Sequence, residues 1–336
     1  MWVNDYALPF GYTYDGYISR EAYDAMTPLK KQEALLMGCV IDGDDAAGTE
    51  ITPTFTGTEA SYDIKASDGI TIEDGMITVT KSNATVTLTF DGVSNAETYL
   101  YIEGLEYTGI SPEDLYSDLE WALMSDYERN EVEYSDKYYE EETAISAIIS
   151  ATNTEGESVS NTLRYYTPEY EWYANQEDFM VNLYYDEYAK TSVTIKFPTV
   201  GSYSYESLQV LFQPMDDYPD QVAALAEDTM ENVDFHENAV NATNLITGTI
   251  SLDEDKYLLL TIPYSEGWTA YVDGEETELL QANTMYMALW LPAGEHDISL
   301  VYKTPGSKAG MIISGISIVI FIGCVIYSRK RNSRKR

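Results

Sequence analysis

An uncharged apolar run near the C-terminus limits the folds open to this chain more than any other part of its sequence. The run reads AGMIISGISIVIFIGCVIY and covers residues 309–327. Its 19 residues would span about 28 Å as an α-helix, close to the ~30 Å hydrocarbon thickness of a bilayer. A buried core helix is the other explanation for such a run, but basic residues follow it directly. The sequence therefore predicts a transmembrane helix over 309–327 and a basic cytoplasmic tail over 328–336.

Six basic residues set the expected direction of this helix: Arg329, Lys330, Arg331, Arg334, Lys335 and Arg336. Basic clusters beside a membrane helix stay in the cytoplasm, so we expect residues 1–308 to be extracytoplasmic. A tail-anchored protein with residues 1–308 in the cytosol is the rival topology, and it would carry these charges across the bilayer. The N-terminal sequence MWVNDYALPFGYTYDG lacks the basic and apolar regions of a signal peptide. We therefore expect an upstream transmembrane region of the same, longer protein to deliver this part across the membrane.

The extracytoplasmic part is strongly acidic. Residues 1–308 hold 13 basic and 57 acidic residues, a net charge of −44. Such a surface repels phosphate backbones, which excludes nucleic-acid binding, and it attracts divalent cations, basic partners or the counter-ions of a cell wall. The two cysteines, Cys39 and Cys324, cannot form an internal disulfide, because Cys324 lies inside the apolar run.

Alternating apolar and polar residues predict strands over most of the chain from about residue 50. Val86, Leu88 and Phe90, for example, alternate with threonines, which is typical of a strand with one buried and one wet face. Asp74-Gly75 and Asp273-Gly274 predict tight hairpin turns, because this pair tolerates positive φ angles.

The predicted fold is mainly β, with tandem antiparallel β-sandwich modules of a jelly-roll-like kind, a few short helices and the transmembrane helix. Glu, Asp and Tyr are abundant over 111–142, where we expect a loop-rich insertion with a short helix after Ser111-Pro112. Ala293-Gly294 predicts a turn that joins 284–291 to 295–302. The predicted segments are a partly helical membrane-proximal segment over 1–47, a first module with the acidic insertion over 48–170, a second module over 171–305, the helix over 309–327 and the tail over 328–336.

No pattern in the sequence assigns catalysis to a residue. The two histidines, His236 and His296, lack the surrounding motif of a triad or a zinc site, and there is no glycine-rich phosphate loop. Carboxylate pairs are too abundant to indicate a glycosidase. No cofactor is evident from these patterns.

Two short acidic clusters are candidate Ca²⁺ sites. Asp42, Asp44 and Asp45 form the first, and the second lies at 216–220. Oxygen-rich loops hold Ca²⁺, but neither cluster has the spacing of an EF-hand. Solvated surface charge is the alternative interpretation.

Tyrosine is unusually frequent, with 30 Tyr against 8 Phe. Tyrosine suits half-exposed sheet positions, and exposed rings also stack on sugars. Consecutive tyrosines on a strand place one ring on each face, so at most one ring of each pair is expected to be free. The candidate sugar contacts are Tyr165, Tyr166, Tyr184, Tyr185 and Trp268.

Several short motifs together resemble one family of bacterial membrane proteins. They are Ile262-Pro263-Tyr264, Gly267-Trp268, Val272-Asp273-Gly274, Gly294-Glu295-His296, Tyr302 and Pro305-Gly306, with Leu8-Pro9-Phe10-Gly11-Tyr12, Lys31-Gln32-Glu33-Ala34-Leu35-Leu36 and Gly201-Ser202-Tyr203-Ser204. This set is similar to the last extracytoplasmic region and final membrane helix of the YfhO family. The matched residues of the C-terminal part are interpreted as structural: two turns, a packed indole, and the junction at Pro305-Gly306 where strand becomes helix.

The resemblance implies a polytopic protein similar to glycosyltransferases that use polyprenyl-phosphate-linked sugars, and a role in adding sugars to teichoic acid or related surface polymers. In that architecture the catalytic acid lies in an early loop upstream of this region, so no catalytic residue is carried over. A membrane-anchored carbohydrate-binding or adhesion protein is the alternative, although Leu291-Pro292-Ala293-Gly294-Glu295 lacks the threonine of a sortase signal. An independent hydrolase is a third hypothesis.

Overall fold

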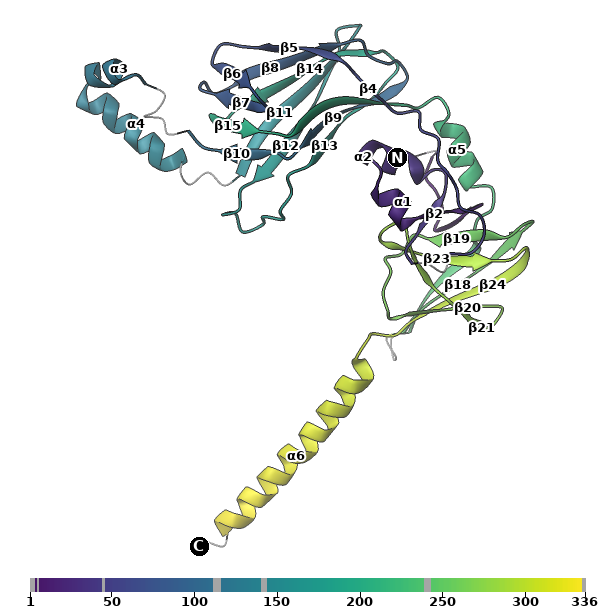
Figure 1. The fold of residues 1–336 in the computed structure, drawn as a ribbon. Helices are drawn as coiled ribbons and strands as arrows, with labels where there is room; N and C mark the ends of the chain where they lie inside the picture. The colour runs from purple at the N-terminus through teal and green to yellow at the C-terminus, as the bar shows by residue number, and fades with distance from the viewer. Residues whose placement is uncertain are drawn as a thin grey trace. The chain divides into compact units, whose positions relative to one another are not determined.

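The computed structural model describes residues 4, 6–43, 46–110, 116–139, 144–238 and 243–333. The chain forms two compact units that interleave along the sequence. The terminal unit comprises Met1–Met26, Ala34–Pro53 and Asp220–Arg336, and the inserted unit comprises Thr27–Glu33 and Thr54–Pro219. The predicted fold class is confirmed: antiparallel sheets dominate, with short helices and one apolar C-terminal helix (Figure 1).

This division differs from the predicted one, which placed a boundary near residues 166–178. β13 (Phe179–Asp186) follows that boundary but pairs with β9 (Ala96–Glu103), which precedes it. β14 (Lys190–Phe197) likewise pairs with β8 (Ala84–Phe90) and β11 (Ala144–Asn153). Strands on both sides of the predicted boundary therefore share one sheet system, and residues 54–219 belong together.

The inserted unit is a two-layer β-sandwich. One layer is a five-stranded sheet in the order β12-β11-β14-β8-β5, and the other consists of the four-stranded sheets β13-β9-β16-β4 and β10-β15-β7-β6. The strands not yet given are β4 (Thr58–Glu59), β5 (Tyr62–Ala66), β6 (Ile70–Glu73), β7 (Met76–Val79), β10 (Glu106–Thr108), β12 (Ser158–Tyr166), β15 (Gly201–Ser204) and β16 (Ser207–Pro214).

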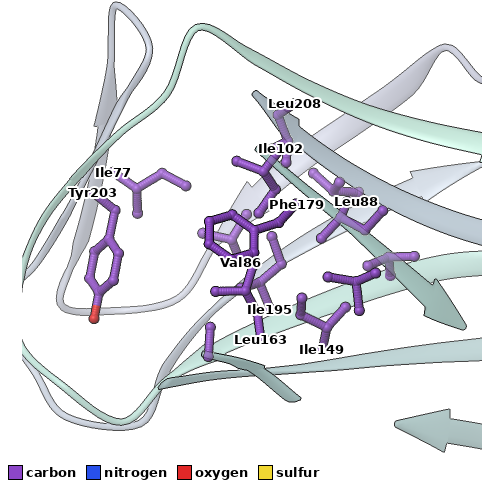
Figure 2. Close-up of a cluster of buried hydrophobic side chains, with 14 of the residues drawn as sticks. Ile77, Val86, Leu88, Ile102, Ile149, Leu163, Phe179, Ile195, Tyr203 and Leu208 are labelled. Atoms are coloured by element: carbon purple, nitrogen blue, oxygen red, sulfur yellow. The ribbon is translucent and has the colours of Figure 1, made fainter. Parts of the chain in front are cut away.

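The core of the inserted unit lies between these layers. Figure 2 shows Leu88, Ile149 and Ile195 from the first layer among Phe179 and Leu208 from the second. Along β8 every second residue is buried, as the period-two pattern predicts. Burying one such aliphatic side chain contributes about 1.5–3 kcal/mol, which makes this apolar layer the main source of the unit's stability.

A buried carboxylate ties helix α2 (Pro28–Ala34) to the sandwich within the inserted unit. Glu33 is 3% exposed, and its Oε1 accepts four hydrogen bonds. The donors are the Thr56 N–H and hydroxyl, both at 2.8 Å, the Gly57 N–H at 3.0 Å and the Gln213 side-chain amide at 2.9 Å. Because these donors come from β16 and from the segment before β4, one side chain fixes three parts of the chain.

The acidic insertion is largely helical where it is described, so the prediction of a loop-rich segment over 111–142 is wrong. It forms α3 (Asp118–Leu123) and α4 (Asp126–Tyr139). Ser117 and Glu120 make a reciprocal capping box at the start of α3, and Ser125 bonds Glu128 in the same way at α4. The helix expected after Ser111-Pro112 would begin outside the described residues.

The terminal unit also has two sheets that share a core. The first has the order β1-β19-β23-β22-β3-β2 and the second β17-β18-β24-β20-β21. Their strands are β1 (Gly11–Tyr14), β2 (Tyr17–Ser19), β3 (Cys39–Ile41), β17 (Glu231–Asn238), β18 (Thr243–Leu252), β19 (Lys256–Leu260), β20 (Trp268–Val272), β21 (Glu275–Thr277), β22 (Leu280–Ala282), β23 (Tyr286–Leu291) and β24 (Gly294–Tyr302).

Strands from both ends of the chain form the first sheet, with β1, β2 and β3 from the N-terminal part and β19, β22 and β23 from the C-terminal part. Gly11 in β1 pairs with Leu260 in β19, and every residue of β19 is buried. A strand that is buried on both faces carries an unbroken apolar run, as Leu258–Leu260 do within KYLLL. Short helices α1 (Arg20–Asp24) and α5 (Tyr218–Leu225) accompany the sheets.

Two of the three predicted turns join paired strands. Asp74 and Gly75 (φ 43° and 78°) connect β6 to β7, and Asp273 and Gly274 (φ 53° and 84°) connect β20 to β21. Ala293-Gly294 does turn the chain between β23 and β24, but these strands belong to different sheets. The predicted turn is therefore present, but it carries the chain from one sheet to the other and does not form a hairpin.

The apolar run forms most of α6 (Ser307–Ser333). Among the described residues this is the one helix that is long and apolar enough to cross a membrane. Its described side chains are exposed throughout, so the apolar surface of residues 309–327 is not buried by the rest of the chain. An apolar helix without protein cover needs a lipid or protein environment.

Candidate carbohydrate-binding surface

Three tyrosines stand half exposed at the turn between β13 and β14. Tyr184, Tyr185 and Tyr188 are 49%, 48% and 48% exposed. We call these three residues the tyrosine cluster. Regular alternation would have buried one ring of the Tyr184-Tyr185 pair. The expectation that one residue of this pair is buried is therefore wrong, although the Tyr185 hydroxyl is engaged, since it donates to Oδ1 of Asn95 at 3.3 Å.

A β-bulge explains why both rings emerge. The pairing of β13 with β9 shifts register between Asn182 and Tyr185, and Tyr184 takes a φ of 66°. A bulge inserts an extra residue and redirects the side chains around it. Left-handed backbone at a bulky residue costs roughly 1–2 kcal/mol, so other contacts must hold it.

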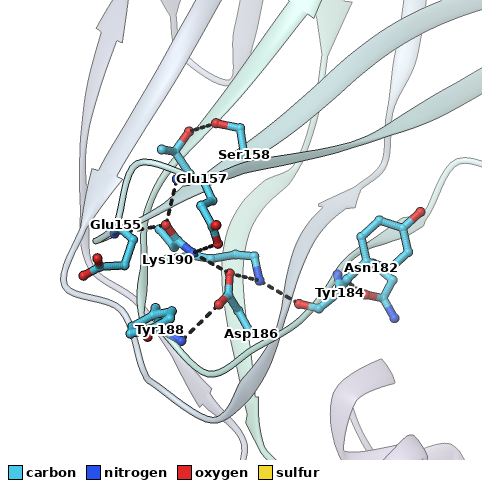
Figure 3. Close-up of polar contacts among 10 residues, drawn as sticks. Glu155, Glu157, Ser158, Asn182, Tyr184, Asp186, Tyr188 and Lys190 are labelled. Atoms are coloured by element: carbon cyan, nitrogen blue, oxygen red, sulfur yellow. Dashed lines mark hydrogen bonds and ion pairs between the residues drawn. The ribbon is translucent and has the colours of Figure 1, made fainter.

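The contact that holds this backbone is made by a buried lysine. The Lys190 side chain is 1% exposed, and its Nζ donates to the Tyr184 carbonyl at 2.8 Å (Figure 3). The same Nζ lies 3.5 Å from Oδ2 of Asp186. The Tyr184 N–H is also bonded, since it donates to Oδ1 of Asn182. Both backbone polar groups of the strained residue are thus satisfied by side chains.

The turn after β11 contacts the turn between β13 and β14 and helps to hold it in place. The Asn153 amide donates to Asp186 Oδ2 at 3.1 Å, while its Oδ1 accepts the backbone N–H groups of Glu155 and Glu157 (Figure 3). The Tyr188 N–H donates to the other oxygen of Asp186 at 3.0 Å. Asp186 therefore connects the turn after β11 with the turn that carries the tyrosine cluster.

The two charged groups in this network have shifted pKa values. Burial lowers the pKa of the Lys190 ammonium, and the nearby Asp186 carboxylate only partly opposes this effect. Burial alone would raise the pKa of Asp186, but the bonds from the Tyr188 N–H and Asn153, together with Lys190, outweigh it and lower that pKa. The carboxylate is therefore ionised at neutral pH, and it serves as a fixed acceptor beside the rings.

The other predicted aromatics fall into two groups. Tyr165 is 5% exposed and belongs to the core, whereas its neighbour Tyr166 is only partly buried and stacks on Tyr170 with ring centroids 4.7 Å apart. This pair does place one ring on each face. Trp268 packs on the Tyr302 ring at 5.0 Å and is partly buried.

Sequence reasoning missed Trp172, which is 68% exposed. Its ring meets the edge of Tyr170 at 6.0 Å, and Tyr170 in turn stacks on Tyr166. The segment TPEYEWYANQED was interpreted only as a module boundary, although an isolated Trp among acidic and polar residues indicates an exposed ring. These three rings lie at and after the end of β12, whereas the tyrosine cluster lies at the C-terminal end of β13 and in the turn that follows.

The family-motif residues of the terminal unit make local structural contacts. Oδ1 of Asp273 accepts the Asp297 N–H and Oδ2 lies 2.8 Å from Nδ1 of His296, whose Nε2 is 2.9 Å from the Pro292 carbonyl. Both ring nitrogens face acceptors, so both donate when the imidazole is protonated. Burial lowers the pKa of His296, but these two bonds outweigh burial and raise it above its usual range.

Glycines of the motif lie where a side chain would not fit or where φ is positive. A Cβ at Gly267 would lie 2.4 Å from the Tyr302 ring, and Gly306, after Pro305, has a φ of 76° where the chain enters α6. Gly294 begins β24 with a φ of 143°. After Pro263, the Tyr264 N–H donates to the Met285 carbonyl at 2.7 Å.

The acidic cluster at Asp42 is only partly described, because Asp44 and Asp45 lie outside the described residues. Asp42 itself has an ion-pair partner, since its Oδ1 is 3.1 Å from Nε of Arg20. Among the described residues, no three or more His, Cys, Asp or Glu side chains gather as metal ligands would. The candidate Ca²⁺ site at Asp42, Asp44 and Asp45 remains a prediction.

Comparisons with known proteins agree with the motifs in the sequence. The family model described as bacterial membrane protein YfhO matches residues 1–314. An uncharacterized protein YfhO of Bacillus subtilis (strain 168) is 22% identical over 334 residues, which cover 98% of this chain and 32% of that protein. The chain thus spans about a third of the length of this relative.

Solved structures give only weak overlaps. Two cryo-EM structures of the arabinofuranosyltransferase AftD from mycobacteria are each 13% identical, with TM-scores of 0.22 and 0.18. They cover 56% and 50% of this chain, and this chain covers 15% and 12% of theirs. TM-scores this low carry no argument about fold or activity, so the assignment follows from the family model: the chain belongs to the YfhO family of bacterial membrane proteins.

Proposed function

We propose that this chain is the extracytoplasmic accessory region of a polytopic membrane protein that resembles lipid-linked-sugar glycosyltransferases. In this proposal the whole protein glycosylates teichoic acid or a related surface polymer, with a polyprenyl-phosphate sugar as donor. The region described by this chain is itself non-catalytic. Its task is to hold a sugar-bearing partner near the membrane, next to the upstream transmembrane region of the same protein.

Family membership and the distribution of charge support this topology. α6 is apolar over 309–327, and six basic residues follow that run directly. Residues 1–308 carry a net charge of −44 on the other side of it. The orientation that leaves the basic cluster in the cytoplasm has the lowest free-energy cost, because no basic residue crosses the bilayer. This orientation places the acidic β-structure outside.

The tyrosine cluster carries the proposal that the region contacts sugar. Three half-exposed tyrosines lie within five residues at the end of β13 and in the turn after it, and a buried Lys190 holds the positive φ of Tyr184. Strain of this kind persists only where surrounding contacts enforce it, and it concentrates at functional sites. Phenol rings offer a flat apolar face for a sugar ring and a hydroxyl for its polar edge. An exposed carboxylate next to the tyrosines, that of Glu187, is an acceptor for sugar hydroxyls.

The proposal is tested in the host bacterium with the full-length protein. A deletion strain is complemented with the wild type or with a Tyr184→Asn/Tyr188→Ser double variant, in which asparagine tolerates the positive φ of residue 184. The measurement is the sugar-to-phosphate ratio of purified teichoic acid, with membrane levels of each protein checked by immunoblot.

We expect the ratio to fall in the deletion strain, to recover with the wild type and to recover only in part with the double variant. A ratio that deletion leaves unchanged would contradict the glycosylation role. If deletion instead impaired only attachment of cells to glycan surfaces, the protein would be an adhesin and the proposed function would be wrong.

A further inference from the structure

The second sheet of the terminal unit continues into the apolar helix through a very short segment. β24 ends at Tyr302 and α6 begins at Ser307 (Figure 1). The Ser307 N–H donates to the Thr304 carbonyl at 3.2 Å, so residues 304–307 form a turn whose ends are less than about 7 Å apart. The two steps from Tyr302 to Thr304 add at most about 7 Å. The Cα of Tyr302 therefore lies within about 14 Å of the start of α6, whatever direction the helix takes.

This end of the sheet lies at the bilayer surface when α6 crosses the membrane. The apolar run begins at Ala309, two residues into α6. The headgroup layer on each side of the hydrocarbon core is roughly 5–7 Å thick. A sheet end that is held so close to Ala309 lies next to this layer. We call this end of the terminal unit, formed by loop 261–267 and segment 302–308, the proximal end.

Loop 261–267 brings exposed apolar side chains to the proximal end. At its start, the Thr261 N–H donates to the Phe10 carbonyl at 3.0 Å, and the Phe10 ring meets the Phe235 ring edge-on at 5.1 Å. In its middle, the Tyr264 N–H donates to the Met285 carbonyl at 2.7 Å. Phe235, Tyr264 and Met285 are 59%, 38% and 51% exposed. Apolar groups that gather in this way without protein cover mark a contact surface.

The end of the same loop holds two further rings. The Gly267 carbonyl accepts the Lys303 N–H at 2.8 Å, which joins the loop to the segment that enters α6. The Trp268 and Tyr302 rings lie beside this bond with their centroids 5.0 Å apart, and both residues are partly buried. Tryptophan and tyrosine are enriched at the interface between membrane and water, because their rings are apolar while the N–H or hydroxyl stays hydrated.

Charge is divided unequally between the two ends of this sheet. At the opposite end, the turns at 253–255, 273–276 and 292–297 hold three, three and two acidic residues and neither Lys nor Arg. At the proximal end, loop 261–267 and segment 302–308 hold Glu266, Lys303 and Lys308, all exposed. Lysines near a membrane are attracted to the phosphates of anionic lipids, whereas a cluster of carboxylates is repelled. The terminal unit thus keeps most of its acidic turns away from the bilayer and places two lysines beside it.

We propose that the proximal end docks on the phospholipid bilayer that α6 crosses. Trp268, Tyr302 and Phe235 lie among the lipid headgroups in this arrangement, and Lys303 and Lys308 contact lipid phosphates. Two observations favour lipid as the occupant: the surface is continuous with the membrane helix, and its lysines complement the charge of the phosphates. The terminal unit is then held to the bilayer at two places, by α6 and by this surface. The inference depends neither on glycosylation nor on the side of the membrane on which the β-structure lies.

The test measures how close each end of the sheet lies to lipid. The full chain is placed in nanodiscs of phosphatidylcholine, with or without phosphatidylglycerol, that contain a lipid with a nitroxide on its headgroup. A fluorescent label is attached to Met285→Cys at the proximal end or to Glu254→Cys at the opposite end, in a Cys324→Ser background; Cys39 is fully buried and stays unlabelled. β24 is nine residues long and separates the two ends by roughly 27 Å. The readout is nitroxide quenching of the label at low and at physiological salt.

Two variants of the labelled chain test the contacts themselves. Phe235→Ser removes an exposed ring, and Lys303→Gln removes an exposed charge. Trp172→Ser and Lys65→Gln are the matched controls, because both residues are exposed on the inserted unit. The comparison of lipids needs no substitution at the proximal surface beyond the label, so it stands even if the ring variant is unstable.

We expect the label at Met285→Cys to be quenched and the label at Glu254→Cys to be unaffected. Phosphatidylglycerol should increase the quenching at low salt more than at physiological salt, because salt screens the lysines. Lys303→Gln should lower the ratio of docked to undocked forms by about fivefold in the anionic nanodiscs, the effect of one lysine near such a surface. Phe235→Ser should lower this ratio in both kinds of nanodisc, and the two control variants should leave it unchanged.

Two results would overturn the inference. Equal quenching of the two labels would show that the proximal end is no nearer to lipid than the acidic turns are. Quenching at Met285→Cys that responds neither to phosphatidylglycerol nor to the two variants would show that the connection to α6 alone keeps this end close, without docking. Neither result changes the expected sugar-to-phosphate ratio of teichoic acid, so the docking and the proposed function fail separately.

Discussion

Replacing Lys190 with methionine should separate the two roles of the buried ammonium, which are to stabilise the inserted unit and to shape the tyrosine cluster. Methionine keeps most of the length of the apolar stem and removes the charge. The Tyr184 carbonyl loses its donor at 2.8 Å, and Asp186 loses a cation at 3.5 Å. A hydrogen bond to a charged group contributes about 1.5–3 kcal/mol, and breaking a buried pair costs about 3–5 kcal/mol.

Two features reduce that cost. Asp186 keeps its bonds from Tyr188 and Asn153, and its side chain is 18% exposed, so water solvates it in part. The variant also no longer buries an ammonium. We therefore expect Lys190→Met to destabilise the inserted unit by about 2–3 kcal/mol, and Lys196→Met, on the more exposed face of the same strand, by less than about 0.5 kcal/mol.

The assay is urea unfolding of the full chain in detergent, followed by tyrosine and tryptophan fluorescence and by hydrogen exchange of the inserted unit. Glycan binding measured on the folded variant should also weaken, because Tyr184 is no longer held at positive φ. If Lys190→Met were as stable as the wild type and bound glycan equally, the argument that this lysine enforces the tyrosine cluster would be wrong.

Three further predictions concern other parts of the chain. Glu33→Ala leaves several buried donors unpaired, so it should lower the free energy of unfolding of the inserted unit by about 3–5 kcal/mol in urea. A loss below about 1 kcal/mol would contradict the role of Glu33 in tying α2 to the sandwich. His296 has a raised pKa and Asp273 a lowered one, so their pair contributes fully to stability above the usual aspartate pKa and below the usual histidine pKa of 6.5, and this contribution is lost as the pH rises through the folded pKa of His296. The urea midpoint of the wild type relative to that of His296→Gln should fall as the pH rises above the usual histidine pKa of 6.5, and parallel pH profiles would refute this. Gly267→Ala forces a Cβ against Tyr302 and should cost about 1–3 kcal/mol in the same assay, whereas an unchanged midpoint would show that the ring moves freely.

Local patterns predicted local structure well. The alternation in β8 and the Asp-Gly pair after β6 depend only on neighbouring residues, and the structure contains both as expected. The helices of the acidic insertion can also be predicted from the sequence. Ser117 and Glu120, like Ser125 and Glu128, have the Ser-x-x-Glu spacing of a capping box. That signal was overlooked amid the high charge of the segment.

The interleaving of the two units could not be read from periodicity. Gly11 pairs with Leu260, which lies about three quarters of the chain length away, and no local pattern specifies a partner at that distance. The entropic cost of closing a loop grows only slowly with its length, so a long insertion between paired strands is tolerated. The predicted boundary near 166–178 followed composition, which does not report which strands pair.

The candidate site was predicted in part for the same reason. Tyr184 and Tyr185 were identified as aromatic candidates, but the bulge that exposes both rings depends on Lys190 and on Asn153, over thirty residues away in sequence. Regular alternation is the default for a strand, and only tertiary contacts reveal where it is broken.

The side of the membrane on which residues 1–308 lie is the point from which the rest of the proposal follows. Single cysteines at Thr154, in an exposed turn, and at Ser333, beyond the apolar run, can be introduced into the full-length protein after its other reactive cysteines are removed. Cys39 can stay, because burial raises the pKa of its thiol and keeps it unreactive. A membrane-impermeant maleimide added to intact cells should label Thr154→Cys at once and Ser333→Cys only after permeabilisation. Labelling of Ser333→Cys but not Thr154→Cys in intact cells would contradict the extracytoplasmic placement and the glycan contact built on it.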